Sequence, residues 1–383
     1  MQWRSAYLRL HAQAALKRLE NPFVYHLLRD ELYEIDNRAL DFLAACDGTR
    51  TGSDLAPDHA FVEYCITEGL LETLARPESV TVPVNKAVSP SLRYLELQLL
   101  HKCNLKCLHC YLGPLHQERL PLDDALRIVR EFSSMGGLRL LISGGEPLLY
   151  EALERFLSET AGSRVRRVLL SNGTLITPRN IGWLKVEEVQ FSLDGWAHGH
   201  NIIRGAGAFE ATMRGIKTVR DAGIAISFAT MIHRGNLREF ELMREFIEEI
   251  GAIEWGIDAP ALTGSFKYHD DLFVPYDQAA PLMAYAFGGG YHGPSDGFAC
   301  GRHLLTVFPD GQAAKCGFYR QQPLGDARQG LKACWLKLEH VPLERLECGE
   351  CSALEECAGG CRYRAPRPLA PDPLMCILHG RAE

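Results

Sequence analysis

The sequence contains no apolar run of the roughly eighteen residues that a membrane-spanning helix needs. It also has no excess of basic residues, because 41 lysines and arginines face 48 aspartates and glutamates and the net charge is −7. That balance gives no basic surface for nucleic acid. The N-terminal residues lack the apolar stretch of a signal peptide, since Arg4 and Arg9 interrupt them. These absences predict a cytoplasmic protein that binds neither a membrane nor nucleic acid.

Cysteine, by contrast, is abundant. The chain has 13 cysteines, and eight of them lie between Cys300 and Cys376. In a reducing compartment such crowding favours metal binding over disulfides, and an odd total fits a disulfide framework poorly. The length of 383 residues suits two or three domains, and a hydrophobic content of 46% with 23% charged residues is typical of soluble globular proteins.

Three cysteines with C-x3-C-x2-C spacing follow a strand-like run at residues 94–100; they are Cys103, Cys107 and Cys110. Thiolates at this spacing can hold one 4Fe-4S cluster from a single loop, and three ligands leave one iron open to bind a substrate or cofactor. The alternatives are a zinc loop and three unrelated buried thiols. Zinc needs a fourth Cys or His, and the nearby His101 and His109 fit no usual zinc pattern.

The cysteine motif is followed directly by an aromatic residue, Tyr111, and later by the turn Gly144-Gly145-Glu146-Pro147. In this combination the sequence resembles the radical S-adenosylmethionine (SAM) enzymes. The resemblance implies that the three cysteines are the catalytic cluster ligands and that the open iron chelates the amino and carboxylate groups of SAM. It further implies that one electron from the cluster cleaves SAM to methionine and a 5′-deoxyadenosyl radical, which abstracts a hydrogen atom from the substrate.

Strand-like segments alternate with helical ones after residue 86, such as the helix predicted at 122–134. The strand candidates are 92–100, 138–143, 167–171, 187–193, 224–231 and 253–259. Alternation of this kind predicts an α/β fold with a parallel sheet and right-handed crossovers. The pattern is similar to the partial (β/α)6 barrel of the radical SAM family, which we expect over residues 86–285. Sites in parallel barrels lie at the carboxyl ends of the strands.

Cofactor-binding candidates, besides Tyr111 and the 144–147 turn, follow two further strands. Glycines in that turn allow a close backbone approach to a ligand, and in the family the turn contacts the SAM amino group. Ser171, Asn172, Ser192 and Asp194 lie in stretches that resemble family segments binding ribose hydroxyls or the SAM carboxylate. Arg204, ten residues past Asp194, is a further candidate that could pair with the SAM carboxylate. The alternatives are ordinary turns at 172–173 and 194–195, and a solvated surface charge at Arg204.

Residues 1–85 form a separate predicted unit. A strand at 30–35 and helices at 38–46 and 61–71 precede a proline-rich linker at 76–90. This order resembles the winged-helix, PqqD-like domain that recognises precursor peptides. The resemblance implies an α+β domain whose exposed strand edge captures a leader peptide by β-augmentation. The alternative is a small domain with a packing role only.

The C-terminal part contains an ordered series of cysteines: Cys300, Cys316, Cys348, Cys351, Cys357, Cys361 and Cys376. The series resembles the SPASM extension of peptide-modifying radical SAM enzymes, which we expect over residues 286–383 and which typically holds two auxiliary 4Fe-4S clusters. The resemblance implies a nearer cluster on the first two and Cys361, and a distal cluster on the other four. The fourth ligand of the nearer cluster stays open between Asp296, Cys334 and a substrate thiolate. One or two zinc sites are the alternative.

Together these resemblances imply a radical SAM/SPASM maturase that abstracts a hydrogen atom from a ribosomally made precursor peptide and installs a thioether or carbon–carbon crosslink. Its cofactors would be SAM and three 4Fe-4S clusters. Its partners would be the leader-bearing peptide and a low-potential electron donor of the flavodoxin or ferredoxin type. Sulfatase maturation is an alternative, disfavoured because Gly317 stands where those enzymes carry an aspartate base. Tetrapyrrole side-chain modification and a non-enzymatic iron–sulfur scaffold are further alternatives.

Overall fold

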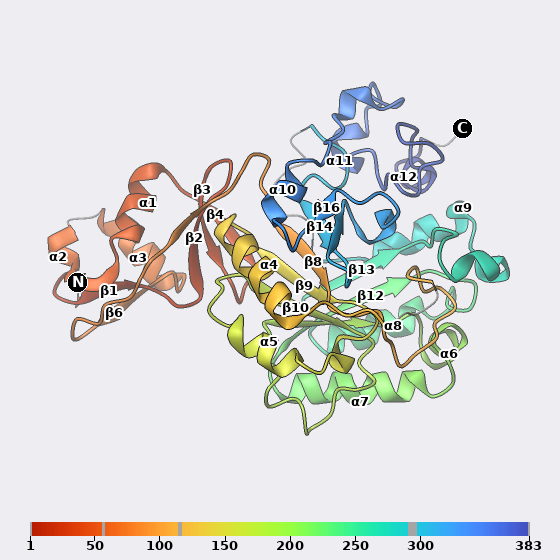
Figure 1. Ribbon diagram of the computed structural model, residues 1–383, viewed down its shortest axis with the longest axis horizontal. Coiled ribbons are helices and arrows are strands. Elements are labelled where there is room, and N and C mark those ends of the chain that lie inside the picture. Colours follow the sequence, from red (N-terminus) through yellow and green to blue (C-terminus); the bar gives the residue numbers. More distant parts are fainter. Residues whose placement is uncertain (1, 56–57, 114–116, 290–296, 382–383) are drawn as a thin grey trace.

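The computed structural model describes residues 2–55, 58–113, 117–289 and 297–381. Figure 1 shows an N-terminal unit of small sheets and helices at one end and a large sheet with helices beside it in the middle. The cysteine-rich C-terminal part lies above that sheet in the same view. None of the described helices is both long and apolar enough to cross a membrane.

The central sheet contains all of the strands that the alternating pattern predicts. They are β8 (Tyr94–Gln98), β9 (Arg139–Ser143), β10 (Arg166–Ser171), β11 (Glu188–Ser192), β12 (Ala225–Met231) and β13 (Glu254–Asp258). Each pairs in parallel with the next one along the chain, so β8 to β13 follow one another across the sheet. Parallel pairing places their carboxyl ends at the same edge. The predicted α/β fold is confirmed.

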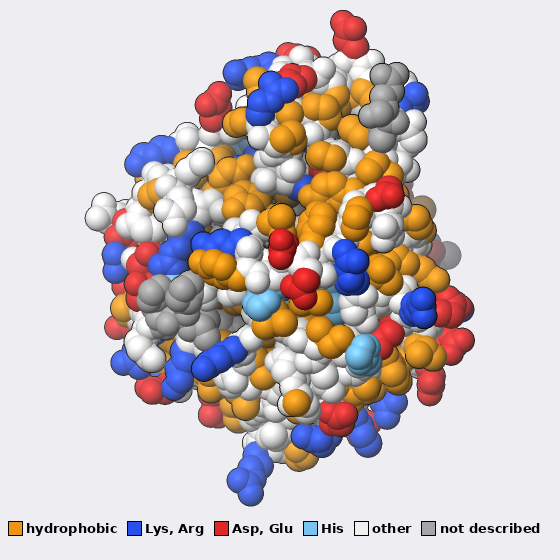
Figure 2. Space-filling model, turned by 90° about the vertical axis from the view of Figure 1, so that its right-hand side faces the viewer, with side chains coloured by type: hydrophobic (Ala, Val, Ile, Leu, Met, Phe, Trp, Pro, Cys, Tyr) orange, Lys and Arg blue, Asp and Glu red, His pale blue; other side chains and the backbone are white. Residues whose placement is uncertain are grey.

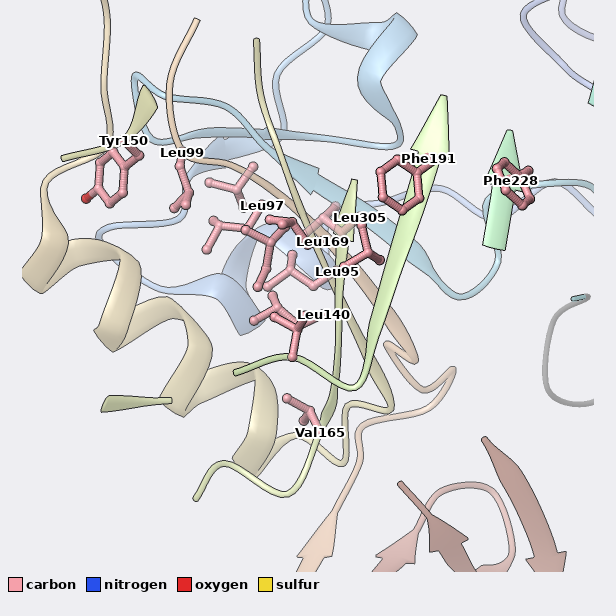
Figure 3. Packing of buried hydrophobic residues seen from close by; sticks show 14 of the residues in the cluster. Leu95, Leu97, Leu99, Leu140, Tyr150, Val165, Leu169, Phe191, Phe228 and Leu305 are labelled. Atoms are coloured by element: carbon pink, nitrogen blue, oxygen red, sulfur yellow. The ribbon is translucent and has the colours of Figure 1, made fainter. Parts of the chain in front are cut away.

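The connecting helices bury their apolar faces in the core that they share with this sheet. They are α4 (Leu122–Ser134), α5 (Leu153–Glu159), α6 (Ala197–Arg204), α7 (Ala208–Asp221) and α8 (Phe240–Glu249). In α4, Ala125, Ile128 and Phe132 recur at helical spacing and are fully buried. Figure 3 shows strand residues such as Leu95 and Leu140 packed together in this core. Burial of these side chains is the main favourable term in folding the central part.

The central sheet continues into the C-terminal part, which the sequence analysis does not predict. β14 (Leu304–Val307) pairs in parallel with β8, and β15 (Gln312–Ala314) and β16 (Gly325–Asp326) follow as antiparallel neighbours. The helices of the C-terminal half are short: α9 (Tyr276–Ala279), α10 (Leu331–Trp335), α11 (Leu354–Cys357) and α12 (Pro373–Leu378). β14 therefore joins the cysteine-rich part to the strand that leads into the first cysteine motif.

The N-terminal unit has more strands than the one predicted at 30–35. Its strands are β1 (Tyr7–Leu10), β2 (Ala14–Arg18), β3 (Pro22–His26), β4 (Glu31–Glu34), β5 (Asp47–Thr51), β6 (Leu71–Leu74) and β7 (Val84–Lys86). Its helices are α1 (Asn37–Ala44), α2 (Gly52–Leu55) and α3 (His59–Thr67). The strands form two sheets, in the orders β5-β1-β6 and β4-β3-β2-β7, so β7 lies inside the predicted linker. Residues 14–17 of β2 are buried in succession, so they give no alternating pattern to detect.

The N-terminal unit is attached at the amino ends of the central strands. Asp30 forms an ion pair with Arg139, the first residue of β9. Arg166, the first residue of β10, donates hydrogen bonds from Nη1 to the carbonyl oxygens of Leu27 and Leu28, at 2.6 and 2.8 Å. These contacts lie at the opposite end of the strands from the residues predicted to form the site.

Candidate active site

A cavity of about 590 Å³ opens where β9, β10 and β11 end. Figure 2 shows the side of the molecule toward which the strands of the central sheet point, with hydrophobic side chains gathered around a hollow. Many of the residues predicted from the sequence line the cavity: Cys103, Cys107, Cys110, Tyr111, Gly144, Gly145, Ser171, Asn172, Ser192 and Arg204. The predicted residues Glu146, Pro147 and Asp194 are not among its described lining residues.

The three cysteines of the C-x3-C-x2-C motif lie on the segment between β8 and α4 and face this cavity. Burial raises the pKa of the Cys103 thiol to about 11 and also raises the pKa values of Cys107 and Cys110. Metal ligation requires the thiolate form. In the described part of the chain, no three His, Cys, Asp or Glu side chains are placed to hold a single metal ion. A 4Fe-4S cluster spreads its thiolates over separate irons, so this donor set fits a cluster with one open iron.

The 144–147 turn packs directly against the cysteine-bearing segment. The amide of Gly145 donates to the carbonyl oxygen of Leu100 at 2.7 Å. A Cβ atom on Gly144 would lie 2.4 Å from that same oxygen, and one on Gly145 would lie 2.2 Å from the carbonyl oxygen of Lys102. The glycines are therefore required for the close approach of two chain segments. Both glycines also line the cavity, where the sequence analysis expects an approach to SAM.

Glu146 lies behind the cavity wall and supports it. Its side chain is fully buried and accepts hydrogen bonds from Ser171 Oγ at 2.9 Å and from the amide of Asn172 at 3.0 Å. It also accepts one from the amide of Leu148, inside the short 3-10 turn that Pro147 begins. Burial raises the pKa of Glu146, and these donors oppose the rise. Glu146 therefore ties the glycine turn to the end of β10.

Asp194 and Arg204 form a buried ion pair beside the cysteines. Arg204 Nε lies 2.6 Å from Asp194 Oδ2, and the side chains are only 9% and 2% exposed. The other Asp194 oxygen accepts from the amide of Met231 at 2.8 Å. Arg204 lines the cavity, and its Nη1 lies 3.9 Å from Cys107 Sγ. The interpretation of Arg204 as a solvated surface charge is therefore wrong, and the Asp194 carboxylate is bound within the protein.

Glu96 is a cavity-lining residue that the sequence analysis missed. Its carboxylate accepts hydrogen bonds from side chains on four segments: Gln98 (3.1 Å), Tyr111 (3.2 Å), Ser143 (2.8 Å) and Thr306 (2.7 Å). It is the only carboxylate among the described residues that line the cavity. The sequence contains a pattern that could have identified it, because Glu96 and Gln98 alternate with leucines in a strand of a sheet that is otherwise expected to be buried. Polar residues at alternate positions there indicate a face turned toward a polar site.

The C-terminal cysteines gather in two further groups. Cys348, Cys351, Cys357 and Cys376 line one small hollow beside α12. Cys300, Cys316 and Cys361 form the other group, in which the thiols influence one another electrostatically. The amide of Arg362 donates to Cys300 Sγ at 3.3 Å. The grouping follows the allocation that the SPASM resemblance implies.

The group formed by Cys300, Cys316 and Cys361 has three cysteine ligands, and Cys334 does not supply a fourth. Cys334 lies in α10 and is buried within the main hydrophobic core. Burial raises the pKa of its thiol, and the charged groups that act on it are Lys337, Asp326 and Glu131 rather than cysteines. The other candidate, Asp296, lies outside the described residues.

Residues 97–247 match the sequence model of the Radical SAM superfamily. The chain contains a radical SAM domain. It is 29% identical to the AdoMet-dependent heme synthase of Nitratidesulfovibrio vulgaris, over 72% of this chain and 89% of that protein. It is 25% identical to the mycofactocin maturase MftC of Mycobacterium tuberculosis, over 79% and 89% of the two chains.

The radical SAM domain lies within a fold that solved structures share. Streptococcus suis SuiB, in its crystal structure bound to precursor peptide SuiA, superposes with a TM-score of 0.70 at 15% identity. The superposition covers 96% of this chain and 99% of SuiB. At that identity the likeness shows the fold. The radical SAM domain identifies the chain as an enzyme, and it implies SAM and one 4Fe-4S cluster as cofactors.

Proposed function

We propose that this radical SAM enzyme modifies a ribosomally made precursor peptide, with residues 1–85 as the peptide-recognition domain. The observation that carries the proposal is an unpaired strand edge in that unit. Within the described residues β4 pairs only with β3, so its outer edge is open. An open edge can take up an extended peptide as an additional strand.

The edge of β4 offers both backbone and side-chain contacts. The amide of Ile35 donates to the carbonyl oxygen of Pro22. This bond shows which residues of β4 direct their backbone groups toward β3 and which direct them outward. By antiparallel alternation, Leu32 and Glu34 then direct their N–H and C=O groups away from β3. Tyr64 of α3 lies beside this strand, is 48% exposed and could contact the side chains of an added strand.

The comparisons support a peptide substrate in two ways. The structure of SuiB, which was determined with a precursor peptide, covers 96% of this chain and so includes most of the N-terminal unit. The mycofactocin maturase is similar over 79% of the chain. A crosslink, either a thioether or a carbon–carbon bond, is the modification that the SPASM resemblance favours.

The cavity residues would divide the work as follows. Cys103, Cys107 and Cys110 would hold the cluster, with SAM against the Gly144–Gly145 turn. When bound, these two cofactors supply a carbon-centred radical able to remove a hydrogen atom. Arg204, fixed by Asp194, keeps a positive charge beside Cys107. The partly buried walls limit access of water to the reacting atoms. The two C-terminal cysteine groups would hold two auxiliary 4Fe-4S clusters within a SPASM domain at 286–383, and residues 86–285 would form the barrel.

A second candidate function is tetrapyrrole side-chain modification, because the heme synthase is 29% identical over most of its length. The cavity gives this candidate less support. Its described lining includes two basic side chains, Lys106 and Arg204, and Arg204 is already paired with Asp194. A tetrapyrrole with several carboxylates would bring further negative charge close to the carboxylate of Glu96. Among the described lining residues, Lys106 is the one basic side chain outside the Asp194–Arg204 pair that could balance these charges.

The deciding experiment compares two substrates on anaerobically reconstituted enzyme with SAM and a reductant. One is a candidate precursor peptide, chosen from short reading frames searched for beside the gene, and the other is iron coproporphyrin. We expect mass spectrometry to show the peptide losing two hydrogen atoms while the porphyrin is unchanged. Loss of carbon dioxide from the porphyrin, with the peptide unaltered, would establish the second candidate instead.

A further inference from the structure

A second hollow, of about 600 Å³, lies on the C-terminal part and carries an excess of positive charge. Its described lining includes four cationic side chains, Lys315, Arg345, Arg362 and Arg367, and one carboxylate, Glu339. Arg345 is paired with Glu339 at 3.3 Å, and Arg367 with a neighbouring carboxylate, Glu347, at 2.9 Å. A positive excess remains on a chain whose net charge is −7. Concentrated charge of one sign around a hollow attracts partners of the opposite sign.

The basic hollow adjoins the C-terminal group formed by Cys300, Cys316 and Cys361. Lys315 directly precedes Cys316, and Arg362 directly follows Cys361. Arg362 is 4% exposed, and its Nε is buried without a hydrogen-bond partner among the described residues. Its backbone amide donates to Cys300 Sγ. A molecule seated in the hollow would therefore lie next to this cysteine group.

Aromatic rings connect the basic hollow to the candidate active site. Tyr363 lines the hollow and stacks on Phe318, with ring centres 4.8 Å apart and planes inclined by 22°. Phe318 in turn lies 5.2 Å from the ring of Tyr111, which lines the active-site cavity next to Cys110. The two sites are thus joined by three successive side chains in contact.

We propose that the basic hollow is the docking surface for an acidic one-electron carrier protein, of the flavodoxin or ferredoxin class. Reductive cleavage consumes one electron for each SAM molecule, and the carrier would supply it while being oxidised by one electron. When the crosslink closes, the peptide radical would lose a proton and one electron, and an auxiliary cluster would accept that electron. The hollow satisfies both requirements of such a surface, since it is positively charged and leads to the active site through packed side chains. The side chains of Arg345 and Arg367 at the rim are 56% and 70% exposed, so the hollow lies at the surface.

The test compares flavodoxin with dithionite, a small reductant that needs no docking surface. The variant Arg345→Glu/Arg367→Glu reverses two side chains that are 56% and 70% exposed, so the fold should persist. The control Arg214→Glu/Arg220→Glu makes the same change in charge on the outer face of α7. The readouts are 5′-deoxyadenosine formation with each reductant and the affinity of purified flavodoxin for the full-length protein by calorimetry.

We expect the Arg345/Arg367 variant to bind flavodoxin roughly tenfold more weakly at low salt and to lose a similar factor in the flavodoxin-driven rate. Its dithionite-driven rate should stay at the wild-type level, and the α7 control should match wild type in every assay. Equal losses with both reductants would overturn the proposal, because the hollow would then serve a step other than docking. Unchanged flavodoxin binding, or the same weakening in the control, would overturn it as well.

Discussion

Arg204 Nε and Asp194 Oδ2 lie 2.6 Å apart in a buried ion pair that also faces Cys107. Asp194 follows β11 and Arg204 is the last residue of the next helix, α6. The ion pair therefore holds the chain between β11 and the end of α6 beside the segment that carries the three cysteines. Breaking one partner leaves the other charge buried and uncompensated. We expect Asp194→Asn to lower the free energy of unfolding by about 3–5 kcal/mol. Urea unfolding measures this, and Asp194→Asn/Arg204→Met should recover part of the loss.

The same pair predicts a pH dependence with a definite sign. Although burial opposes it, the charge of Arg204 lowers the pKa of Asp194 well below its usual value. A carboxyl group with a depressed pKa contributes stability that is fully present above the unfolded value of about 3.9 and is lost as the pH falls below it. The difference in unfolding free energy between wild type and Asp194→Asn should therefore shrink below about pH 4. A difference that stays constant down to acid unfolding would contradict this assignment.

Iron content tests the three cysteine groups. Anaerobically reconstituted wild-type protein should hold about twelve irons per chain, and Cys103→Ala/Cys107→Ala/Cys110→Ala about eight. The matched control is Cys46→Ala/Cys65→Ala/Cys334→Ala, which removes three buried thiols outside the groups and should keep the full iron content. A wild-type value of about four falling to none would show that the C-terminal cysteines hold no iron–sulfur clusters.

Glu96 ties the cysteine segment, through Tyr111, to the glycine turn, through Ser143. We expect Glu96→Gln to lower the rate of SAM cleavage by roughly tenfold or more, because small displacements of reacting groups have large kinetic effects. Glu188→Gln is the control, since that buried carboxylate binds Arg166 at the amino end of the barrel. Rates of 5′-deoxyadenosine formation are compared at equal folded fraction. Equal losses in the two variants would reduce Glu96 to a purely structural group.

The open edge of β4 is tested by proline substitution. Leu32→Pro removes an outward N–H group, and proline is tolerated at such edge positions. We expect it to abolish capture of the precursor peptide, measured by fluorescence anisotropy, while SAM cleavage persists. Thr73→Pro is the matched control on β6, another edge strand. The hydrogen bond between His11 and Leu70 and the register of β1 and β6 show that the N–H group of Thr73 also points outward. If Leu32→Pro binds the peptide as wild type does, capture occurs elsewhere.

Lys17 gives a second pH-dependent prediction at the attachment of the N-terminal unit. Its Nζ is buried and donates to the carbonyl oxygens of Gly137 and Arg164, at 2.8 and 2.9 Å. Burial, aided by the charge of Arg164, lowers the pKa of Lys17 to about 7. Between this value and the unfolded value of about 10.4 the unfolded chain binds the extra proton, so stability should rise with pH. Relative to Lys17→Met, wild-type unfolding free energy should increase over that window.

Local patterns predicted the central strands and the cysteines that meet at the cavity, because periodicity and spacing depend only on residues that are close together in the sequence. They missed what depends on distant partners. β14 joins β8 across some two hundred residues of chain, which no periodicity reveals. Asp194 was expected to reach a ligand, and its carboxylate instead binds Arg204. The glycines at 144 and 145 were expected to approach a cofactor, and their backbone also meets the segment at 100–102.

The attachment of the N-terminal unit at the amino ends of the barrel strands has a consequence for any captured peptide. Asp30, just before β4, is paired with Arg139 at one end of the barrel, whereas the cavity opens at the other. A strand of the length of β10 already spans about 20 Å. The tether between the captured segment and the modified residue must therefore exceed about six extended residues. Beyond that minimum, capture raises the local concentration of the target residue at the cavity, so tether length would select which residue of the peptide is reached.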